Sequence, residues 1–504
     1  MPITSTEGLK DNASFPVYLY GAAVQGIQGF IFQTNELKDI VGASEMVEEI
    51  CTTKFRNDFM ADGELIVSAA GNIKCLFTSE EQCRTAVMNF PRVVMEAAPG
   101  ITISQAVVKT SNEEIDCSFQ TVVNRLEERL RAQRNRVAKS LTTGLMAIER
   151  SRKTGLPAIK VIKDGENMVF LDSGTAMKKD RSKEGVATLK LCNKSFGREV
   201  KASDVALDIK ELTDRNDWIA IIHADGNGLG AILANKGGTK EGLHSFSSRL
   251  SEATETAAQK AYSVIAKNKD RKKIPIRPVV LSGDDHTVIC SADIAIAYAK
   301  SFIAHFEEET AQKELPLTAC AGIAFIKSSY PFHYGYQLAE TLCSIAKKDA
   351  KLRVVNGIIP SCLMFYKVQS SFVEKFADIV EKELTPQVGH SFVFGPYYLH
   401  EQPQRWTIQK LMELADLMSA KKDRSESDAK DGNAIKSDLR NWMTLMHEGI
   451  AKADQRKMRV LQLAKKEIRD CFSEAVTPVK RDGKKCYPAY DILSVSTVEN
   501  LKTK

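Results

Sequence analysis

The stretch Val279-Val280-Leu281-Ser282-Gly283-Asp284-Asp285-His286-Thr287-Val288-Ile289-Cys290 holds two apolar, β-rich runs on either side of a Ser-Gly-Asp-Asp turn. Turn residues between two such runs predict a β-hairpin with Asp284 and Asp285 at its tip. Taken alone, a Gly-Asp turn is ordinary turn chemistry, and it favours a solvent-facing hairpin. A second stretch upstream changes this interpretation.

That stretch is Trp218-Ile219-Ala220-Ile221-Ile222-His223-Ala224-Asp225-Gly226-Asn227-Gly228-Leu229-Gly230. It reads as a buried strand that delivers Asp225 into a Gly-rich turn at the start of a helix. Asp225 would then lie beside Asp284 and Asp285, and the carbonyl of Gly226 could complete the set. Because Mg²⁺ prefers carboxylate and carbonyl oxygens, we predict a catalytic site for two divalent cations, Mg²⁺ or Mn²⁺.

The same stretches predict nucleotide contacts. Glycines at a helix start let phosphates approach backbone N–H groups, although a lone Gly-rich turn is weak evidence. Lys347 and Lys351 lie one turn apart on a predicted helix, so both ammonium groups can meet one triphosphate; a solvated basic helix end is the alternative. The predicted nucleotide-binding residues are Gly226, Asn227, Gly228, Ser282, Gly283, Lys347 and Lys351.

Composition sets the outer limits. With 504 residues, 43% hydrophobic and 27% charged, the chain predicts an ordinary globular protein of two to four domains. A net charge of +6 permits phosphate-rich ligands or RNA without requiring them. The eleven cysteines include no C-x-x-C pair, which favours reduced core thiols, and Cys192 stands alone where a zinc site would need partners. No apolar run reaches a membrane span and no signal peptide is recognisable, which predicts a cytoplasmic location.

The chain repeats one order of elements. Its first part predicts strand 17–24, helix 37–54, hairpin 64–68 and 73–77, helix 80–96 and strand 101–108, which is the βαββαβ order of a ferredoxin-like fold. The second part predicts strand 218–224, helix 243–266, the acidic hairpin, helix 292–307, strand 315–325 and helix 336–351. In the first copy, Ser68-Ala69-Ala70-Gly71-Asn72 replaces the acidic tip. We infer an internal repeat with one acidic and one neutral member.

The remaining segments are less informative. Residues 118–152 predict a long helix, residues 178–183 a solvated basic loop, and residues 361–366 and 392–398 two strands. The end of the chain predicts helices 408–419, 435–446 and 456–468, with a polar, mobile segment at 421–433.

The ordered set D-G-N-G-L-G, S-G-D-D, A-C-A-G-I-A-F (Ala319–Phe325) and A-E-x-L-x-x-x-A-K resembles the nucleotidyl-cyclase palm of GGDEF diguanylate cyclases and of the large subunit of type III CRISPR effector complexes. The CRISPR large subunit is the closer match. Gly26-Ile27-Gln28, Phe30-Ile31-Phe32 and Gly42-Ala43-Ser44 are similar to its degenerate first palm. Thr154–Ala158 and Gly395–Tyr398 are also similar to family features.

The resemblance implies an α+β fold with two ferredoxin-like palm domains. The expected domains are a degenerate first palm (1–115), a connecting helical and β region (116–214), a catalytic second palm (215–400) and a C-terminal helical domain (401–504). It also implies metal binding at Asp225, Asp284 and Asp285, and triphosphate contacts from Lys347 and Lys351. The acceptor nucleotide would lie near Gln28, Gly42 and Ser44 of the first palm.

The chain also departs from the family. Ser282 replaces the first glycine of G-G-D-D, and Asn227 stands where a second aspartate is common, which removes one negative charge. No HD nuclease motif precedes the first palm, and no zinc is expected. The resemblance therefore implies a compact, ATP-binding nucleotidyltransferase of CRISPR-type antiviral defence, whose product would be a cyclic oligonucleotide, either cyclic oligoadenylate or a cyclic dinucleotide made from ATP.

Two other functions remain open. The chain can be a scaffold subunit that holds CRISPR subunits and a guide–target RNA duplex, with synthesis dependent on target RNA or absent. A diguanylate cyclase is disfavoured because such an enzyme pairs two identical chains, whereas this chain carries both palms.

Overall fold

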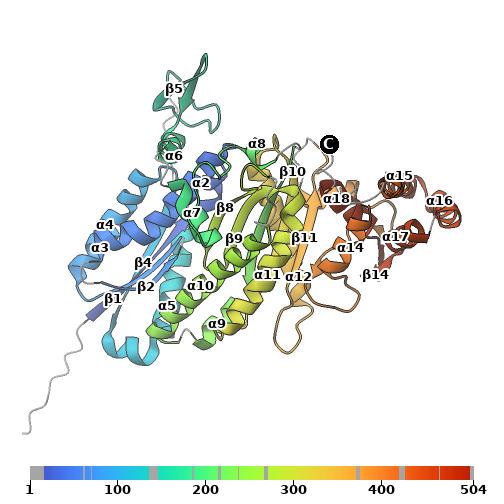
Figure 1. Ribbon diagram of the computed structural model, residues 1–504. Helices are drawn as coiled ribbons and strands as arrows, with labels where there is room; N and C mark the ends of the chain where they lie inside the picture. Colours follow the sequence, from blue (N-terminus) through green and yellow to red (C-terminus); the bar gives the residue numbers. More distant parts are fainter. Residues whose placement is uncertain are drawn as a thin grey trace, which may run out of the picture. The chain divides into compact units, whose positions relative to one another are not determined.

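The computed structural model describes residues 16–60, 63–69, 71–135, 146–183, 187–213, 217–236, 238–265, 271–370, 375–418, 426–464 and 466–499 (Figure 1). The chain divides into two units. The first unit comprises Met1–Ile27, Met46–Glu149 and Gly230–Ser248, and the second comprises Gln28–Glu45, Arg150–Leu229 and Arg249–Lys504. Each unit is built around its own sheet.

The first unit contains a four-stranded sheet with strand order β2-β3-β1-β4. Its strands are β1 (Pro16–Gln25), β2 (Gly63–Ala69), β3 (Asn72–Phe77) and β4 (Thr102–Ser111). Its helices are α3 (Phe55–Phe59), α4 (Glu80–Ala97) and α5 (Asn112–Arg134), and a π-helical turn (Ile50–Lys54) links α3 to α2 (Leu37–Glu49). Leu19 and Val108 of the sheet pack against Phe119 and Leu126 of α5. The predicted βαββαβ order is confirmed.

The second unit contains a six-stranded sheet with strand order β13-β11-β10-β7-β9-β8. Its strands are β7 (Trp218–Asn227), β8 (Ile276–Ser282), β9 (Asp285–Ser291), β10 (Thr318–Lys327), β11 (Cys362–Lys367) and β13 (Tyr397–Tyr398). Helices α10 (Lys240–Ile265), α11 (Ala295–Gln312) and α12 (Phe332–Lys351) connect them. Strands β8, β9, β7 and β10 repeat the order found in the first unit, so the predicted two ferredoxin-like folds are confirmed.

Helix α12 lies directly on the central strand β10. A Cβ atom added at Gly322 of β10 would lie 1.9 Å from the carbonyl oxygen of Ala339 and 2.4 Å from the backbone nitrogen of Cys343. Only glycine allows the helix backbone to come this close to a strand. The position of α12, which carries Lys347, therefore depends on Gly322.

The long helix predicted for residues 118–152 is shorter than expected. Helix α5 begins earlier, at Asn112, has non-helical dihedral angles at Ser118, and ends at Arg134. Residues 136–145 lie outside the described part, and residues 146–152 form turns. The Ser151 amide donates to the carbonyl of Leu156 and the Gly155 amide donates to the carbonyl of Ser151, at 2.9 and 2.8 Å. This tight turn before Pro157 replaces the helix.

The predicted basic loop at residues 178–183 is wrong, since these residues belong to α6 (Ser173–Lys183). Asp172 accepts a hydrogen bond from the Thr175 amide at 3.1 Å and so starts the helix. Lys178 is 1% exposed, and its ammonium lies over the ring of Phe30 and donates to that residue's carbonyl. Burial lowers the pKa of Lys178 to about 8. This lysine is therefore a buried packing residue.

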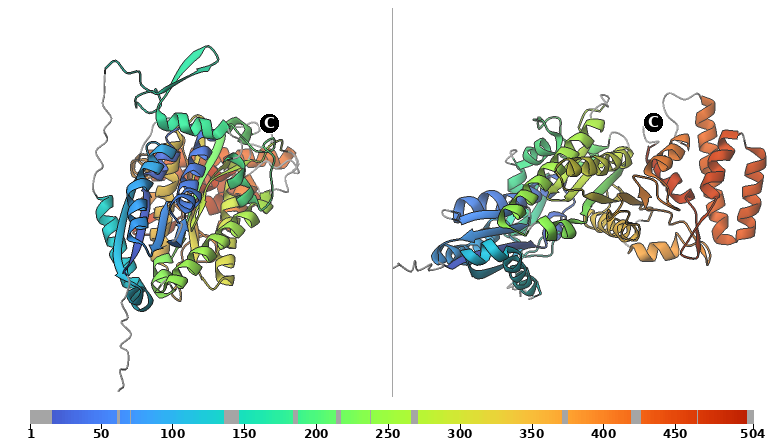
Figure 2. Two further views of the ribbon diagram at one scale, coloured as in Figure 1. Left: turned by 90° about the vertical axis from the view of Figure 1, so that its left-hand side faces the viewer. Right: turned by 90° about the horizontal axis from the view of Figure 1, so that it is seen from below.

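The remaining helices and strands of the chain are short or lie towards its C-terminus. They are α1 (Ile27–Ile31), β5 (Lys160–Asp164), β6 (Asn167–Leu171), α7 (Ala187–Phe196), α8 (Ile209–Leu212), α9 (Leu229–Lys236), a 3-10 turn (Ala292–Ile294), α13 (Phe376–Lys382), β12 (His390–Ser391), α14 (Ile408–Met418), α15 (Glu426–Glu448), α16 (Ile450–Leu463), α17 (Lys466–Val476), β14 (Val479–Arg481), β15 (Lys484–Cys486) and α18 (Ala489–Glu499). Figure 2 shows the C-terminal helices, in orange and red, gathered together.

The C-terminal predictions are right in kind, but several boundaries differ. The helix predicted at 435–446 begins at Glu426, and the helix predicted at 456–468 covers the end of α16 and the start of α17. The strand predicted at 392–398 is reduced to Tyr397–Tyr398, because Pro396 has no N–H to donate to a ladder. Within the predicted mobile segment, residues 421–425 lie outside the described part, and residues 426–433 belong to α15. The helical C-terminal region itself is confirmed.

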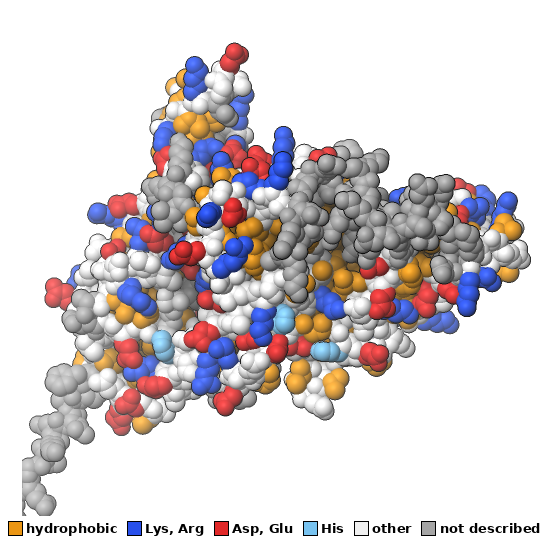
Figure 3. Space-filling model, in the orientation of Figure 1, with side chains coloured by type: hydrophobic (Ala, Val, Ile, Leu, Met, Phe, Trp, Pro, Cys, Tyr) orange, Lys and Arg blue, Asp and Glu red, His pale blue; other side chains and the backbone are white. Residues whose placement is uncertain are grey.

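The distribution of charged side chains and the state of the cysteines match what the composition predicts. Acidic and basic side chains are intermixed on the face drawn in Figure 3. All eleven cysteines are free thiols, and only Cys117 is exposed. A search of the described helices finds none with the length and apolarity that crossing a bilayer requires.

Asp491 of α18 provides a test of packing in the second unit. Its buried carboxylate accepts hydrogen bonds from the Tyr397 hydroxyl at 2.7 Å and the Gly395 amide at 3.2 Å. Burial raises the pKa of Asp491 from an ordinary 3.8 to about 7. A folded pKa above the unfolded value means that stability is lost as the pH rises from about 4 to about 7. Asp491→Asn should therefore melt higher than the parent protein at pH 8, with a smaller difference at pH 4.

Thermal melts of both proteins from pH 4 to 8.5 measure this effect. The two melting temperatures should diverge between pH 4 and 7 and stay parallel above pH 7. Tyr397→Phe is the control, because it removes one hydrogen bond without removing the buried charge. A constant offset at every pH would show that Asp491 is ionised throughout in the folded state.

Candidate functional site

The site lies where β7 ends beside the start of β9. The antiparallel register pairs Ala224 of β7 with His286 of β9, which places Asp225 beside Asp285. One ligand atom each from His223, Asp225 and Asp285 lies within 4.8 Å of the others. His223 is buried, Asp225 is partly buried and Asp285 is exposed. The structure thus brings together carboxylates that lie sixty residues apart in the sequence.

Asp284 joins this group from the hairpin tip. A Cβ atom added at Gly226 would lie 2.9 Å from the Cβ of Asp284, so the missing side chain of Gly226 makes room for the aspartate. Burial, a hydrogen bond with Asp225, and then the charges of Asp225 and Asp285 raise the pKa of Asp284 to about 8. The three predicted acids therefore form one cluster.

Asp285 is influenced by the same neighbours. The Asp285 side chain reaches solvent, but the protein around it removes part of its hydration, and this raises its pKa. The negative charges of Asp225 and Glu340 raise it further, whereas the positive charge of Lys347 lowers it. The resulting pKa is about 6. Carboxylates whose pKa values are raised by burial and mutual repulsion lack sufficient compensating positive charge. This donor set fits a hard divalent cation, which would supply that charge.

Lys347 is the cation that faces the acids. Its ammonium donates to the carbonyl oxygen of Gly226 at 2.8 Å and forms an ion pair with Asp225. Lys351 is one turn later, exposed at the end of α12. No hydrogen bond or ion pair in the described part of the chain joins Lys351 to the acids. The structure thus places one of the two predicted lysines in the cluster.

Asn227 continues the face of β7 that carries Asp225. It is 4% exposed, and its amide group donates to the Thr318 hydroxyl at 3.0 Å and to the Cys320 thiol at 3.2 Å. Within the described residues, its side-chain oxygen is buried without a hydrogen-bond partner. An unsatisfied buried oxygen two residues from Asp225 can coordinate a cation or accept a hydrogen bond from a polar ligand.

The hairpin turn that carries Ser282 and Gly283 is held by a side chain of α10 and by its own strand pairing. The carbonyl oxygen of Gly283 accepts from the Thr254 hydroxyl at 2.6 Å, and Ser282 pairs with Asp285 across the hairpin. Gly228 is exposed between the end of β7 and the first residue of α9.

The predicted acceptor residues belong to a segment, Gln28–Glu45, that packs in the second unit. The side-chain amide of Gln28 donates to Glu340 at 3.4 Å, and the ring of Phe32 stacks on Tyr336 at 4.3 Å. These contacts fix Gln28 against the same helix that carries Lys347. Gln28 is exposed and available to a ligand.

Gly42 and Ser44 are placed differently. The buried hydroxyl of Ser44 donates to the carbonyl oxygen of Val279, and a Cβ atom added at Gly42 would lie 3.2 Å from the carbonyl oxygen of Lys178. Both positions serve the packing of this segment, and neither is brought to the acids by a described contact.

Two site residues were not predicted from the sequence. His223 lies two residues before Asp225 and therefore on the same face of β7. Its Nδ1 atom lies 3.1 Å from the Thr287 hydroxyl, and burial lowers its pKa to about 4, so the ring is neutral and able to act as a ligand. Glu340 lies seven residues before Lys347, two turns along the same helix face. Both periodicities were visible in the sequence.

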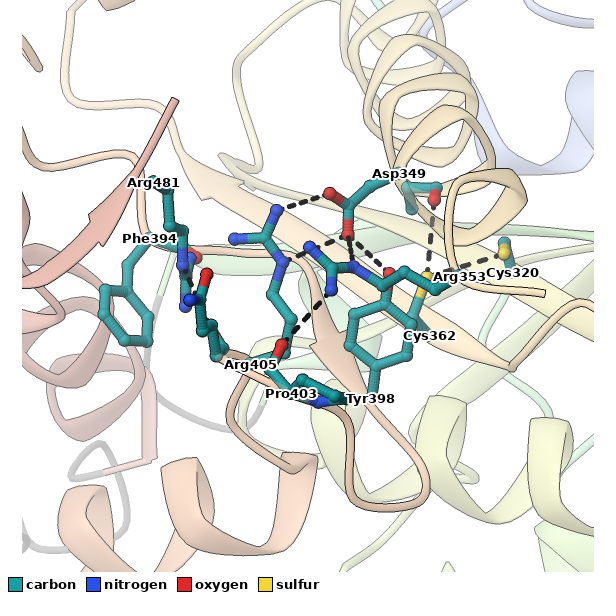
Figure 4. Close-up of polar contacts among 11 residues, drawn as sticks. Cys320, Asp349, Arg353, Cys362, Phe394, Tyr398, Pro403, Arg405 and Arg481 are labelled. Atoms are coloured by element: carbon teal, nitrogen blue, oxygen red, sulfur yellow. Dashed lines mark hydrogen bonds and ion pairs between the residues drawn. The ribbon is translucent and has the colours of Figure 1, made fainter. Parts of the chain in front are cut away.

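Asp349 anchors the end of α12, and Figure 4 shows it facing side chains from separate elements. It accepts hydrogen bonds from Arg353 at 3.0 Å, from Arg405 at 3.1 Å, and from the Tyr398 hydroxyl. Burial acts to raise the pKa of Asp349, but the hydrogen bonds from Arg405 and Tyr398 outweigh it and lower the pKa below the ordinary value. The network holds the end of the helix that positions Lys347.

We expect Asp349→Asn to destabilise the protein by about 3 kcal/mol, because it leaves Arg405 and Arg353 without their shared counter-charge in a largely buried place. Glu448→Gln, which breaks an exposed ion pair with Lys452, should cost less than about 0.5 kcal/mol. Urea unfolding of both variants at pH 7.5 measures the difference. Equal losses would mean that the network adds nothing beyond a surface contact.

Comparisons with known proteins agree with this geometry. Residues 218–355 match the family model described as Cas10/Cmr2, second palm domain. A comparison of the sequence with curated proteins finds no match. Among solved structures, the chain is similar to a Csm1-Csm4 cassette in complex with cA4, with 13% identity, a TM-score of 0.60, and coverage of 97% of this chain and 70% of that one.

Two further structures give nearly the same result. A Csm1-Csm4 cassette in complex with one ATP has 13% identity and a TM-score of 0.59, covering 98% of this chain and 70% of that one. A Csm1-Csm4 subcomplex of the type III-A CRISPR-Csm interference complex has 13% identity and a TM-score of 0.58, covering 97% and 70%. The fold likeness extends over both units, and the family match covers the acidic palm. Residues 218–355 therefore match the second palm domain of the Cas10/Cmr2 family, and the chain as a whole has a fold similar to that of the Csm1-Csm4 structures.

Proposed function

We propose that the protein is a metal-dependent nucleotidyltransferase that joins NTPs, ATP above all, into cyclic oligonucleotides within a type III CRISPR defence system. The observation that carries this proposal is the cluster of Asp225, Asp284 and Asp285 with Lys347 beside it. The match of this segment to the Cas10/Cmr2 second palm supports it. Similar folds solved with ATP and with cA4 support the choice of nucleotide.

The proposed cations are two Mg²⁺ or Mn²⁺ ions. Bound divalent cations neutralise the charge that develops on the phosphate oxygens when a 3′-hydroxyl attacks an α-phosphate. Asp225, Asp284 and Asp285 would hold them with the carbonyl oxygen of Gly226. The neutral His223 ring and the side-chain oxygen of Asn227 are further donors on the same face of β7.

Lys347 has two roles in this proposal. Without cations its ammonium balances Asp225 and takes the carbonyl oxygen of Gly226. A divalent cation would compete for these oxygens, and the released ammonium would be free to bind the triphosphate of the donor. Cation and nucleotide binding would therefore reinforce each other. Lys351, Gly228, Ser282 and Gly283 remain proposed phosphate contacts.

The acceptor nucleotide would lie on the Gln28 side of the acids. Gln28 is exposed and already bonded to Glu340, whose charge acts on Asp285. An acceptor held there has its 3′-hydroxyl close to the donor, which supplies much of the acceleration through proximity. Gly42 and Ser44 would support this arrangement through packing.

The decisive experiment is to incubate the purified protein with labelled ATP and Mg²⁺ or Mn²⁺, and then with all four NTPs, and to identify products by mass spectrometry. A variant with Asp284→Ala and Asp285→Ala runs in parallel, with Glu448→Gln as a surface control. A cyclic oligoadenylate formed by the parent and the control, but not by the double variant, supports the proposal. Equal product from all three would end the catalytic assignment.

A second function, an effector scaffold bound to guide and target RNA, is favoured by the likeness to an interference-complex subunit. The same assay separates the two. Product from the isolated chain favours a stand-alone synthetase. Product only with partner subunits and target RNA favours an effector whose synthesis is switched on by RNA.

A further inference from the structure

A polar pocket lies at the opposite end of the sheet from the acids. Trp218, which lines it, is the first residue of β7, and Asp225 follows seven residues later on the same strand, roughly 23 Å away. The pocket has a volume of about 580 Å³ and is lined by β7, β11, α15 and α18, all within the second unit. Helix α18 contacts both α15 and β11 beside it. It is therefore separate from the catalytic cluster.

Strand register gathers positive charge at this end. Lys327 of β10 pairs with Trp218 of β7, and Lys367 of β11 pairs with Phe325, two residues before Lys327. The ammonium groups of Lys327 and Lys367 lie 4.5 and 4.4 Å from the centroid of the Trp218 ring. These cation–π contacts hold two cations at one indole.

Lys367 of β11 lies in the wall of the pocket. Its ammonium donates to the Thr497 hydroxyl at 2.8 Å. Burial, followed by the charges of Lys327, Arg440 and Lys436, lowers the pKa of Lys367 to about 8. The positive charges of Lys327, Arg440 and Lys436 thus lie close enough to Lys367 to lower its pKa. The groups that shift this pKa include no carboxylate.

Few carboxylates line the pocket to balance the positive charge of its lysine and arginine side chains. Among the described residues that line it, the single carboxylate is Glu383, and this side chain already accepts from the Tyr366 hydroxyl at 2.8 Å. Arg440 of α15 is exposed at the rim. Converging cations without an equal number of acids raise the free energy of the empty pocket, and a bound anion lowers it.

The other lining groups include hydroxyls and aromatic rings. The hydroxyls of Thr444 and Thr497 donate to the carbonyl oxygens of Arg440 and Ser494, at 3.0 and 2.8 Å, so the charged groups Lys367 and Arg440 are the donors left for phosphate oxygens. The indole of Trp218 and the ring of Tyr490 add apolar surface. The volume lies within the range of small-molecule sites. A free inorganic phosphate would leave most of this space unfilled.

We propose that this pocket binds a phosphate-bearing small molecule of nucleotide size, whose phosphate lies between Lys367 and Arg440 and whose remainder contacts Trp218 and Tyr490. The site is independent of the acids and of metal. It gives the second palm and the C-terminal helices a common ligand, since β7 and β11 supply one wall and α15 and α18 supply the other.

The test is calorimetric titration of the full chain with AMP, and separately with inorganic phosphate, in EDTA and at constant ionic strength. Without metal, AMP binding should persist when Asp284→Asn and Asp285→Asn are combined. Lys367→Met and Arg440→Gln should each weaken it at least about 10-fold, the scale of one charge-assisted hydrogen bond. Lys452→Met, at an exposed site elsewhere, should leave it unchanged.

Thermal melting distinguishes binding from folding. Lys367→Met removes a repelled, half-buried charge, so its melting temperature should not fall, while the rise that AMP produces in the parent protein should disappear. The exposed Arg440→Gln keeps the test valid if Lys367→Met fails to fold. AMP binding that survives both variants but is lost in the acid variant would overturn the proposal. Equal affinity for phosphate and AMP, or binding of an RNA oligonucleotide alone, would overturn it as well.

Discussion

Replacing both Asp284 and Asp285 by asparagine should reduce nucleotide joining by about 10³-fold or more, which is the scale on which removing groups that stabilise transition-state charge acts. Asparagine keeps the shape of the side chains but removes two of the acids that would hold the cations. Because burial and mutual repulsion raise the pKa values of both carboxylates, the neutral variant should fold at least as well as the parent protein.

Two measurements separate lost chemistry from lost structure. Product formation is followed with labelled ATP and Mn²⁺, and thermal melting is recorded without metal at pH 7.5. The expected outcome is no product and an equal or higher melting temperature. Mn²⁺ titration by electron paramagnetic resonance should show weaker binding in the variant. Retained product with unchanged Mn²⁺ affinity would place the catalytic ions elsewhere.

Lys347→Met should lower kcat/KM for ATP by about 10- to 100-fold, which corresponds to the roughly 1.5–3 kcal/mol of a hydrogen bond between charged groups. The matched variant is Lys351→Met, one turn along α12. Lys351 is the outer of the two proposed phosphate contacts: it is exposed and has no described contact with the acids, so losing its solvent-screened contact should cost only about 3-fold under moderate salt.

Metal affinity provides the second readout for Lys347. Its ammonium takes the carbonyl oxygen of Gly226 and pairs with Asp225. Without this competitor, the Mn²⁺ affinity of Lys347→Met in the absence of nucleotide should be equal or higher, while the KM for ATP rises. A drop in Mn²⁺ affinity together with unchanged KM would mean that Lys347 organises the acids and leaves the triphosphate to other groups.

Local patterns in the sequence identify much of this protein. Strand alternation and turn residues predict both ferredoxin-like folds, and the acids fall at strand ends because the apolar runs stop there. The helix that bears Lys347 follows from its apolar spacing. These features depend on neighbours within a few residues, which is the range over which propensity and periodicity act.

Other features depend on contacts between distant segments. Lys178 reads as solvated in a charged run, yet it is buried on Phe30 because a helix starts at Asp172. Ser44 reads as an acceptor contact, yet its hydroxyl donates to a strand more than two hundred residues away.

Sequence alone therefore determined which elements form and which of them carry acids, since periodicity and turn chemistry are local. Only the tertiary structure decided which side chains share a site, because strand register and close packing at Gly322 set those distances. It added His223 and Glu340 to the acids and joined Gln28 to Glu340 through a hydrogen bond. It also assembled a basic pocket from Trp218, Lys367 and Arg440, which no local pattern connects.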